Sequence, residues 1–158
     1  MFRSMRRFRQ QLDDAQCAQL LRTAPRGVLA VAGDDGYPYA LPLDFFFDEE
    51  SGCLYSHCAR EGHKLDAIRR CDKVSFCVMD EGYRREGEWA LNIRSVIVFG
   101  RMRIVEDREK ALDMVRRLGL KYYPSAEDVE EEMRKDAHRV LCLELVPEHI
   151  SGKTVNES

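Results

Sequence analysis

Residues 54–70 decide the fold, and they read Leu-Tyr-Ser-His-Cys-Ala-Arg-Glu-Gly-His-Lys-Leu-Asp-Ala-Ile-Arg-Arg. The first residues are typical of a strand, the last carry the stripe of an amphipathic helix, and a polar loop joins them. Gly62 is the residue of that loop that takes a positive φ without strain, which suits a sharp turn into the helix. The helix would then open with the free N–H groups of His63, Lys64 and Leu65, which can donate to a phosphate. A Lys64 that is simply solvated fits the same pattern, and this stretch alone favours neither interpretation.

The composition is that of one globular domain. The chain has 158 residues and a mass of 18.3 kDa, with 44% hydrophobic and 34% charged residues, which suits one core but not two. A net charge of −3 and a pI of about 5.9 give no reason to expect binding to nucleic acid or to a membrane. No apolar run approaches the roughly 20 residues that span a bilayer. The basic residues 1–11 have no apolar segment behind them, so we expect no secretory signal.

The six cysteines are scattered without a CxxC pair. Together with the missing signal, this predicts reduced thiols in a cytoplasmic protein. Cys53, His57, Cys58 and His63 have the atoms to hold zinc, but their spacing matches none of the usual structural patterns. The segment would also have to fold back on itself to bring them together. We therefore expect no metal site.

Apolar runs separated by turn residues predict about six strands, at residues 27–32, 37–47, 53–56, 74–79, 89–105 and 140–146. Helices are predicted at residues 14–24, 65–71, 107–119 and 126–134. Tight turns between the first strands favour antiparallel pairing, and Arg94, Ser95 and Gly100 are expected to bend the long fifth strand. We expect one α+β, mainly β domain over residues 1–158, with helices at its margins and with residues 1–10 and 150–158 as tails. Closure into a barrel would remove exposed strand edges.

Short motifs recur along the chain in a fixed order. They are Met5-Arg6-Arg7, Gly27-Val28-Leu29-Ala30, Gly36-Tyr37-Pro38-Tyr39, Pro42-Leu43-Asp44-Phe45, Tyr55-Ser56-His57-Cys58-Ala59, Glu61-Gly62-His63-Lys64, Ser95-Val96, Phe99-Gly100 and Ile150-Ser151-Gly152-Lys153. No single piece is specific, but the ordered set resembles the FMN-binding split-barrel superfamily of pyridoxamine 5′-phosphate oxidase-like proteins. Within that superfamily, the chain is most similar to the branch that includes nitroimidazole-resistance proteins.

The resemblance implies a homodimer of six-stranded antiparallel split β-barrels, with an FMN in each of two clefts between the subunits. FAD in place of FMN stays open. The residues that would lie along the isoalloxazine ring are Pro42, Leu43, Asp44 and Phe45. Those that would meet the ring edge or the ribityl chain are His57, Cys58 and Ala59. The phosphate would lie at the helix start formed by Gly62, His63 and Lys64, with Ser95 and Val96 contributing a hydroxyl and backbone groups near it.

Several of these side chains admit two roles. His57 can be a catalytic acid, because the resembling histidine of the nitroimidazole-resistance branch is associated with the active site, or it can be a hydrogen-bonding residue beside the cofactor. Cys58 can be a redox thiol, although a small packing residue is the commoner role. Trp89, Tyr122 and Tyr123 either stack on a flavin or substrate or pack in the core or an interface.

The sequence and the resemblance together predict an FMN-dependent oxidoreductase that reduces a small electron-poor organic molecule, such as a nitro compound. NAD(P)H or another donor would supply the electrons. A cofactor that carries the chemistry would explain why no nucleophile-and-base pair stands out. The alternative from another class is a non-catalytic flavin- or haem-binding carrier or sensor, and nothing in the sequence separates the two. Gly62 and Lys64 argue against a barrel that has lost its cofactor. Oxidation of pyridoxamine phosphate is disfavoured because the C-terminal region has no arginine-rich motif for the substrate phosphate.

Overall fold

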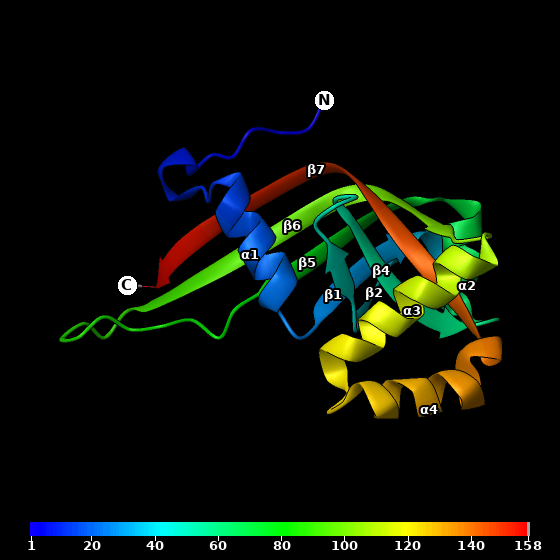
Figure 1. The fold of residues 1–158 in the computed structure, drawn as a ribbon. Helices are drawn as coiled ribbons and strands as arrows, with labels where there is room; N and C mark the ends of the chain where they lie inside the picture. The colour runs from blue at the N-terminus through cyan, green and yellow to red at the C-terminus, as the bar shows by residue number, and fades with distance from the viewer. Residues whose placement is uncertain (158) are drawn as a thin grey trace.

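The computed structural model describes residues 1–157 and shows a curled antiparallel sheet with four α-helices packed around it (Figure 1). The strands are β1 (Gly27–Ala32), β2 (Pro38–Leu43), β3 (Phe46–Asp48), β4 (Cys53–Ala59), β5 (Lys73–Met79), β6 (Leu91–Ile104) and β7 (Val140–Glu157). The α-helices are α1 (Asp14–Thr23), α2 (His63–Arg70), α3 (Arg108–Tyr122) and α4 (Ala126–Asp136). Three 3₁₀ turns join them, η1 (Phe8–Gln10), η2 (Asp34–Gly36) and η3 (Ala137–Arg139).

The sheet has seven strands rather than the expected six, in the order β2-β1-β5-β6-β7-β4-β3. The extra strand arises because the segment expected as one strand, residues 37–47, leaves the sheet at residues 44–45 and forms β2 and β3 separately. β2 and β3 are opposite edges of the sheet, yet only these two residues join them. Because two residues span at most about 7 Å, the sheet must curl until its edges approach each other. No ladder joins β2 to β3 in the part of the chain that the structure describes, so the barrel is open.

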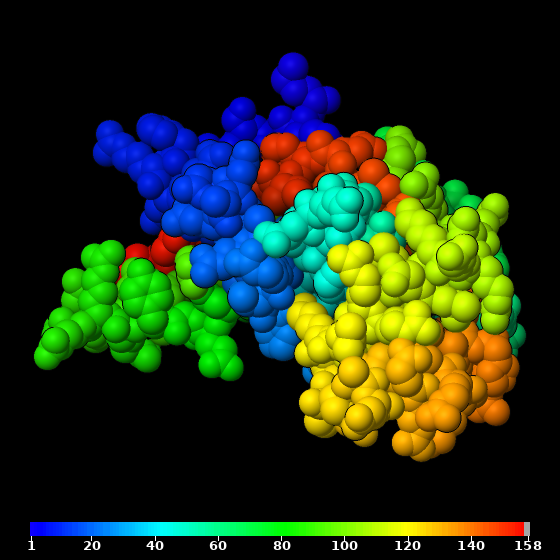
Figure 2. Space-filling view, viewed as in Figure 1, coloured from blue at the N-terminus to red at the C-terminus, as the bar shows by residue number. Residues whose placement is uncertain are grey.

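The last strand is longer than the sequence indicates. Residues 150–157, expected as part of a tail, form the second half of β7 and pair with the first half of β6. With the loop that precedes β6, they form an arm that extends away from the body of the molecule (Figures 1 and 2). The sequence does not show this pairing, because residues 150–157 are mostly small or polar and lack the apolar alternation from which strands are recognised.

Two other expectations for this region have different outcomes. The β6–β7 register shifts between Phe99 and Gly100, which confirms the bend expected at Gly100, but pairing runs through Arg94 and Ser95 without a shift. A side chain at Gly100 would collide with the carbonyl of Val146. At the other end of the chain, residues 1–10 carry the turn η1, and the next residue, Gln11, forms a β-bridge with Lys153.

Helices α1 and α3 begin where the sequence indicates, at capping side chains. Asp13 caps α1 in a capping box with Gln16, and Asp107 caps α3 by accepting from the N–H of Lys110. α3 was expected to end at Gly119, but it continues to Tyr122 because Gly119 is the close-approach point against α4. A Cβ there would lie 3.0 Å from the side chain of Val129. No helix within residues 1–157 is long and apolar enough to cross a membrane.

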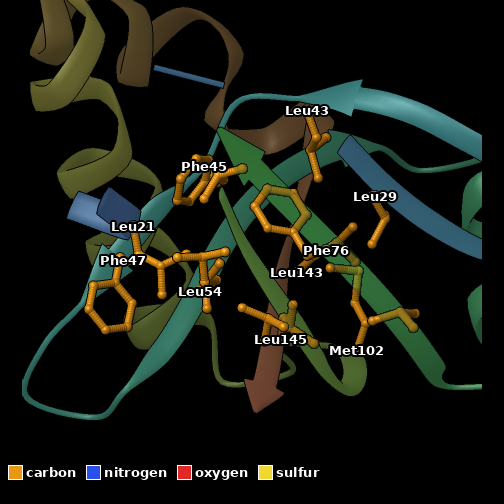
Figure 3. Close-up of a cluster of buried hydrophobic side chains, with 14 of the residues drawn as sticks. Leu21, Leu29, Leu43, Phe45, Phe47, Leu54, Phe76, Met102, Leu143 and Leu145 are labelled. Carbon is orange, nitrogen blue, oxygen red and sulfur yellow. The ribbon is translucent and has the colours of Figure 1, made fainter. Parts of the chain in front are cut away.

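The core fills the inside of the curl. Figure 3 shows part of it, in which Phe45 meets the edge of Phe76 with ring centroids 4.9 Å apart, surrounded by leucines from β4, β1 and β7. A second, smaller cluster lies on the other face of β4, beneath α3, and consists of Cys53, Tyr55, Met114 and Cys142. Successive residues of β4 therefore serve two cores on opposite faces of the sheet.

A buried carboxylate fixes α3 to the sheet next to the small cluster. Glu144 on β7 accepts from the hydroxyl of Tyr55 and the ammonium of Lys110, each at 2.6 Å, and from the guanidinium of Arg103 at 2.7 Å. Burial alone would raise the pKa of this carboxyl group, but the three donors outweigh it and lower the pKa to about 2. Glu144 is therefore ionised at neutral pH.

Candidate functional site

The turn from β4 into α2 has the expected geometry. Gly62 adopts φ +134° and ψ 166°, a conformation that is essentially confined to glycine, which confirms the positive φ predicted for it. A Cβ at Gly62 would meet no atom within 4 Å, so the backbone is open to approach from outside. The first intrahelical hydrogen bond runs from the N–H of Asp66 to the carbonyl of Gly62. No side chain caps this end of α2, which leaves its first N–H groups available to an anion.

The two basic residues of that first turn have different surroundings. The ring of His63 stacks on Tyr39 of β2 with centroids 4.2 Å apart, and its Nε2 lies 3.5 Å from a carboxylate oxygen of Asp34. Lys64 is half-buried, and within residues 1–157 its ammonium has no hydrogen-bond or ion-pair partner. Lys64 is therefore the cation of this turn that can meet an added anion.

His57 lies on β4 near this helix start. It is on the same face of the strand as Tyr55, and therefore faces α3 rather than the inside of the curl. Part of the imidazole reaches solvent, yet the surrounding protein desolvates it. This burial lowers the pKa of His57 below its ordinary value, and the positive charge of Lys64 lowers it further against the opposing effect of Asp44. The imidazole is neutral at pH 7.

A pocket of about 370 Å³ opens beside His57. Asp44 and His57 form one wall, and the facing sides of α3 and α4 form the other. The helices contribute apolar side chains at its base, together with the aromatic residues Tyr122 and Tyr123 at the end of α3. Its volume lies at the small end of the roughly 300–1,000 Å³ of small-molecule sites, which is enough for one or two fused rings.

The end of α3 holds the crossing between β2 and β3 in place. The hydroxyl of Tyr122 accepts from the N–H of Phe45 at 3.0 Å and lies 2.7 Å from the carbonyl of Pro25, to which it donates. The ammonium of Lys121 donates to the carbonyls of Ala24 and Phe45 at 2.7 and 2.9 Å. Desolvation lowers the pKa of Lys121 to about 8, although Asp44 opposes the shift. The sequence gives no signal for Lys121, because its partners are backbone groups distant in sequence.

Four residues expected to meet a cofactor have side chains that are buried in the core. Phe45 is 1% exposed and packs on Phe76, and its backbone N–H and carbonyl are engaged by Tyr122 and Lys121. Its ring is therefore not available as the wall of a flavin site. The other three are Leu43, Cys58 and Val96. Burial also raises the pKa of the Cys58 thiol, which favours packing over the redox role.

The remaining predicted residues are exposed or half-buried, but not all are close together. Pro42, Ala59 and Gly62 are exposed and Asp44 is half-buried. Ser95 lies on β6 opposite Lys153, whereas His57 pairs with Cys142 near the start of β7. These two points are eleven positions apart along β7, or roughly 36 Å of strand length. Within one chain, Ser95 and Val96 therefore do not join the group around Lys64.

Two further sequence expectations concern other functional groups. Cys53 and Cys58 point to opposite faces of β4, so the four residues weighed as a zinc site do not converge. Arg94, which precedes Ser95 on β6, forms an ion pair with the carboxylate of Asp80 at 2.8 Å. Trp89 is 74% exposed and lies in the loop that precedes β6.

Comparison with solved structures identifies the fold. A candidate 5-nitroimidazole antibiotic resistance protein from Bacteroides thetaiotaomicron matches with a TM-score of 0.76 at 17% identity, covering 93% of this chain and 87% of that one. A FAD-binding protein from Mesorhizobium loti matches with 0.67 at 24% identity, covering 92% and 97%. A FAD and haem binding protein from Mycobacterium smegmatis matches with 0.73 at 23% identity, covering 91% and 72%. At these identities the likeness shows the fold alone.

Sequence comparison then gives the family. No curated protein matches the chain by sequence. A family model described as pyridoxamine 5′-phosphate oxidase matches residues 13–154, which include every strand except the end of β7. The open antiparallel barrel, the glycine turn into α2 and this match agree, and the chain belongs to the pyridoxamine 5′-phosphate oxidase family.

Proposed function

We propose that this protein is a flavin-dependent oxidoreductase whose cofactor phosphate binds at the start of α2. The observation that carries the proposal is the uncapped helix start at Gly62, where free N–H groups and the unpaired Lys64 lie close to His57 and its pocket. Three structures with this fold are named as binding FAD or as conferring nitroimidazole resistance, which supports a flavin as the anion. The finer assignment to FMN rests on the sequence resemblance.

The residues of this turn fit a flavin phosphate. An incoming anion would meet backbone N–H groups, the positive end of the helix dipole and the ammonium of Lys64. The acidic residue of this first turn, Asp66, is exposed and lies 3.9 Å from the guanidinium of Arg69. Gly62 lets the phosphate come close to the backbone because it has no Cβ.

The flavin would supply the electron-transfer chemistry, and the chain would position the reactants. His57 is neutral at pH 7, so one ring nitrogen can donate a hydrogen bond while the other accepts one. It can therefore orient a polar substituent of a substrate and hold or deliver a proton at that point. The pocket between His57, α3 and α4 would exclude water from a small electron-poor molecule, for which a nitro compound is our first candidate.

We further propose that the working unit is a homodimer. Apolar side chains cover the outward face of the sheet in a continuous row across neighbouring strands, from Val28 on β1 through Cys77 on β5 to Ile97 on β6. Phe99 and Met79 extend this row, at 40% and 59% exposure. A second copy would cover this face, and it would also bring in Ser95, which one chain alone holds far from Lys64. Such an interface should exceed roughly 2,000 Å² in total.

Light scattering tests the dimer directly. The parent should be a stable dimer at micromolar concentration, and Ile97→Arg should dissociate it because a charge then enters the apolar face. Leu120→Arg is the control, since Leu120 is also an exposed apolar residue but lies on α3. A parent protein that is monomeric would contradict the dimer and the composite cofactor site.

The function itself is tested with the purified protein and its absorption spectrum. A yellow protein that releases one FMN per subunit on denaturation, and that bleaches anaerobically with NADH or NADPH, is the expected result. Release of FAD instead would support the proposed flavin site and show that the cofactor is FAD rather than FMN. A bound flavin that no donor reduces would favour the non-catalytic carrier or sensor, an alternative favoured by the solved structure named as binding both FAD and haem. A colourless protein that binds neither flavin at tens of micromolar would contradict the proposal.

A further inference from the structure

The pocket beside His57 has a charge pattern that the flavin proposal does not explain. Its base is apolar, with Val115 and Leu118 from α3 and Val129 and Met133 from α4. Glu132 lies among these apolar residues, on the face of α4 that lines the pocket. Val129, Glu132 and Met133 follow the i, i+3, i+4 spacing of one helix face, and that face points to the pocket.

Glu132 is the carboxylate of the pocket that lacks a cation. Asp44 is paired with Arg26 at 2.7 Å, and Asp136 is paired with Arg139 at 3.2 Å. Glu132 is half-buried and forms no ion pair within residues 1–157. A carboxylate that lines an apolar pocket and has no ion-pair partner can pair with the positive charge of a ligand.

The cations near the pocket do not fill this role. No lysine or arginine of residues 1–157 lines it. Lys121 directs its ammonium away, to the carbonyls of Ala24 and Phe45. Lys64 lies on the side of His57 where α2 begins, and on α4 itself Lys135 is paired with Glu131 on the outer face.

We propose that this pocket binds a small aromatic cation, with its ring between the apolar side chains of α3 and α4 and its positive charge against Glu132. The volume of about 370 Å³ suits one or two fused rings, and Tyr122 and Tyr123 at the rim offer aromatic faces to a cation. A ring that carries a positive charge is also electron-poor. That the cation is the substrate of the reaction rests on the proposed function, whereas its binding does not.

The test compares two probes of the same shape. N-methylquinolinium carries a charge, and 1-methylnaphthalene is its neutral isostere. Their dissociation constants are measured by equilibrium dialysis on the purified protein, with and without added FMN. We expect the cation to bind about tenfold more tightly than the isostere, which corresponds to about 1.4 kcal/mol.

Matched variants locate the charge effect. Glu132→Gln should weaken the cation about tenfold and leave the isostere unchanged. Glu131→Gln makes the same chemical change one residue away on the outer face of α4, and should affect neither probe. Ala137→Leu should weaken both probes, because Ala137 lines the pocket and a larger side chain fills it. Thermal unfolding of each variant shows that the chain is folded.

The outcomes separate this inference from the proposed function. Equal affinity for the two probes, or equal losses in Glu132→Gln and Glu131→Gln, would overturn the cation site whatever the flavin does. A protein that binds the cation with Glu132 but takes up no flavin would retain the site and contradict the oxidoreductase.

Discussion

The ammonium of Lys121 donates to the carbonyl of Phe45 at 2.9 Å and lies 4.0 Å from the centroid of the Phe45 ring. One residue of α3 thus holds both the backbone and the side chain at the point where the chain crosses from β2 to β3. This crossing brings the two edges of the sheet together and places Asp44 beside the pocket.

Lys121→Met should destabilise the protein by about 1–3 kcal/mol, because two carbonyls lose a donor in a largely desolvated place. The loss should depend on pH. The folded pKa of about 8 lies below the ordinary lysine pKa of 10.5, so the parent gains stability as pH rises from 8 towards 10.5. Urea unfolding at pH 7 and pH 9 should show a larger difference between parent and variant at pH 9. A difference that shrinks with rising pH would contradict the buried ammonium.

Glu144→Gln should cost about 1.5–3 kcal/mol, because Tyr55, Lys110 and Arg103 lose their charged acceptor. The pKa of Glu144 is about 2 when folded, against 4.5 ordinarily, so its stabilisation is complete above pH 4.5 and is lost as pH falls towards 2. Urea unfolding at pH 7 and pH 3 should therefore show a flatter pH dependence in the variant. Glu148→Gln, an exposed partner of Arg101, is the control and should change stability by less than about 1 kcal/mol.

Gly62→Asn should lower stability by about 1–3 kcal/mol, since φ +134° with ψ 166° is closed to other residues. Flavin affinity should fall with it, because the N–H groups at the start of α2 are displaced. Gly52→Asn is the matched control: its φ of +71° lies in the left-handed region that asparagine adopts, and a Cβ there meets no atom. Equal losses in the two variants, measured by thermal unfolding, would show that Gly62 has no special geometry.

The electrostatic link between His57 and Lys64 can be measured without any cofactor. The imidazole of His57 should titrate below pH 6.5 in an NMR pH series, because burial and then Lys64 lower its pKa. Lys64→Ala removes the second cause, so the midpoint should rise. Lys73→Ala, an exposed lysine on β5, should leave it unchanged. A midpoint that does not move in Lys64→Ala would place the two side chains too far apart for one site.

Local signals in the sequence predicted local structure well. The caps at Asp13 and Asp107 start their helices, and the turn at Gly62 has the expected conformation. What failed depends on distant contacts. Residues 37–47 form two strands because Tyr122 and Lys121, at the end of α3, bind the backbone of Phe45. Gly119 was expected to end α3, but its lack of a side chain serves the close packing of α4 against α3.

The site shows the same division. Lys64 and His57 lie near each other because a short loop joins them, and the sequence shows this directly. Phe45 and Cys58 belong to motifs that resemble the family, but both side chains are buried in the core. Cys58 faces inward because side chains alternate along β4, and Phe45 faces inward because it lies where the chain crosses from β2 to β3. Glu132 could have been found as a carboxylate on the apolar face of a helix, whereas the position of Ser95 relative to Lys64 depends on how the whole sheet is paired.

The phosphate at the start of α2 is tested most directly by four dissociation constants: the parent and Lys64→Ala, each with FMN and with riboflavin, which lacks the phosphate. Removing one charge-assisted hydrogen bond costs about 1.5–3 kcal/mol, so the variant should bind FMN about 10- to 100-fold more weakly. Riboflavin should bind equally to both proteins, since it has no group for Lys64 to meet. If Lys64→Ala weakens both ligands alike, or neither, then Lys64 does not hold the phosphate and the cofactor site lies elsewhere.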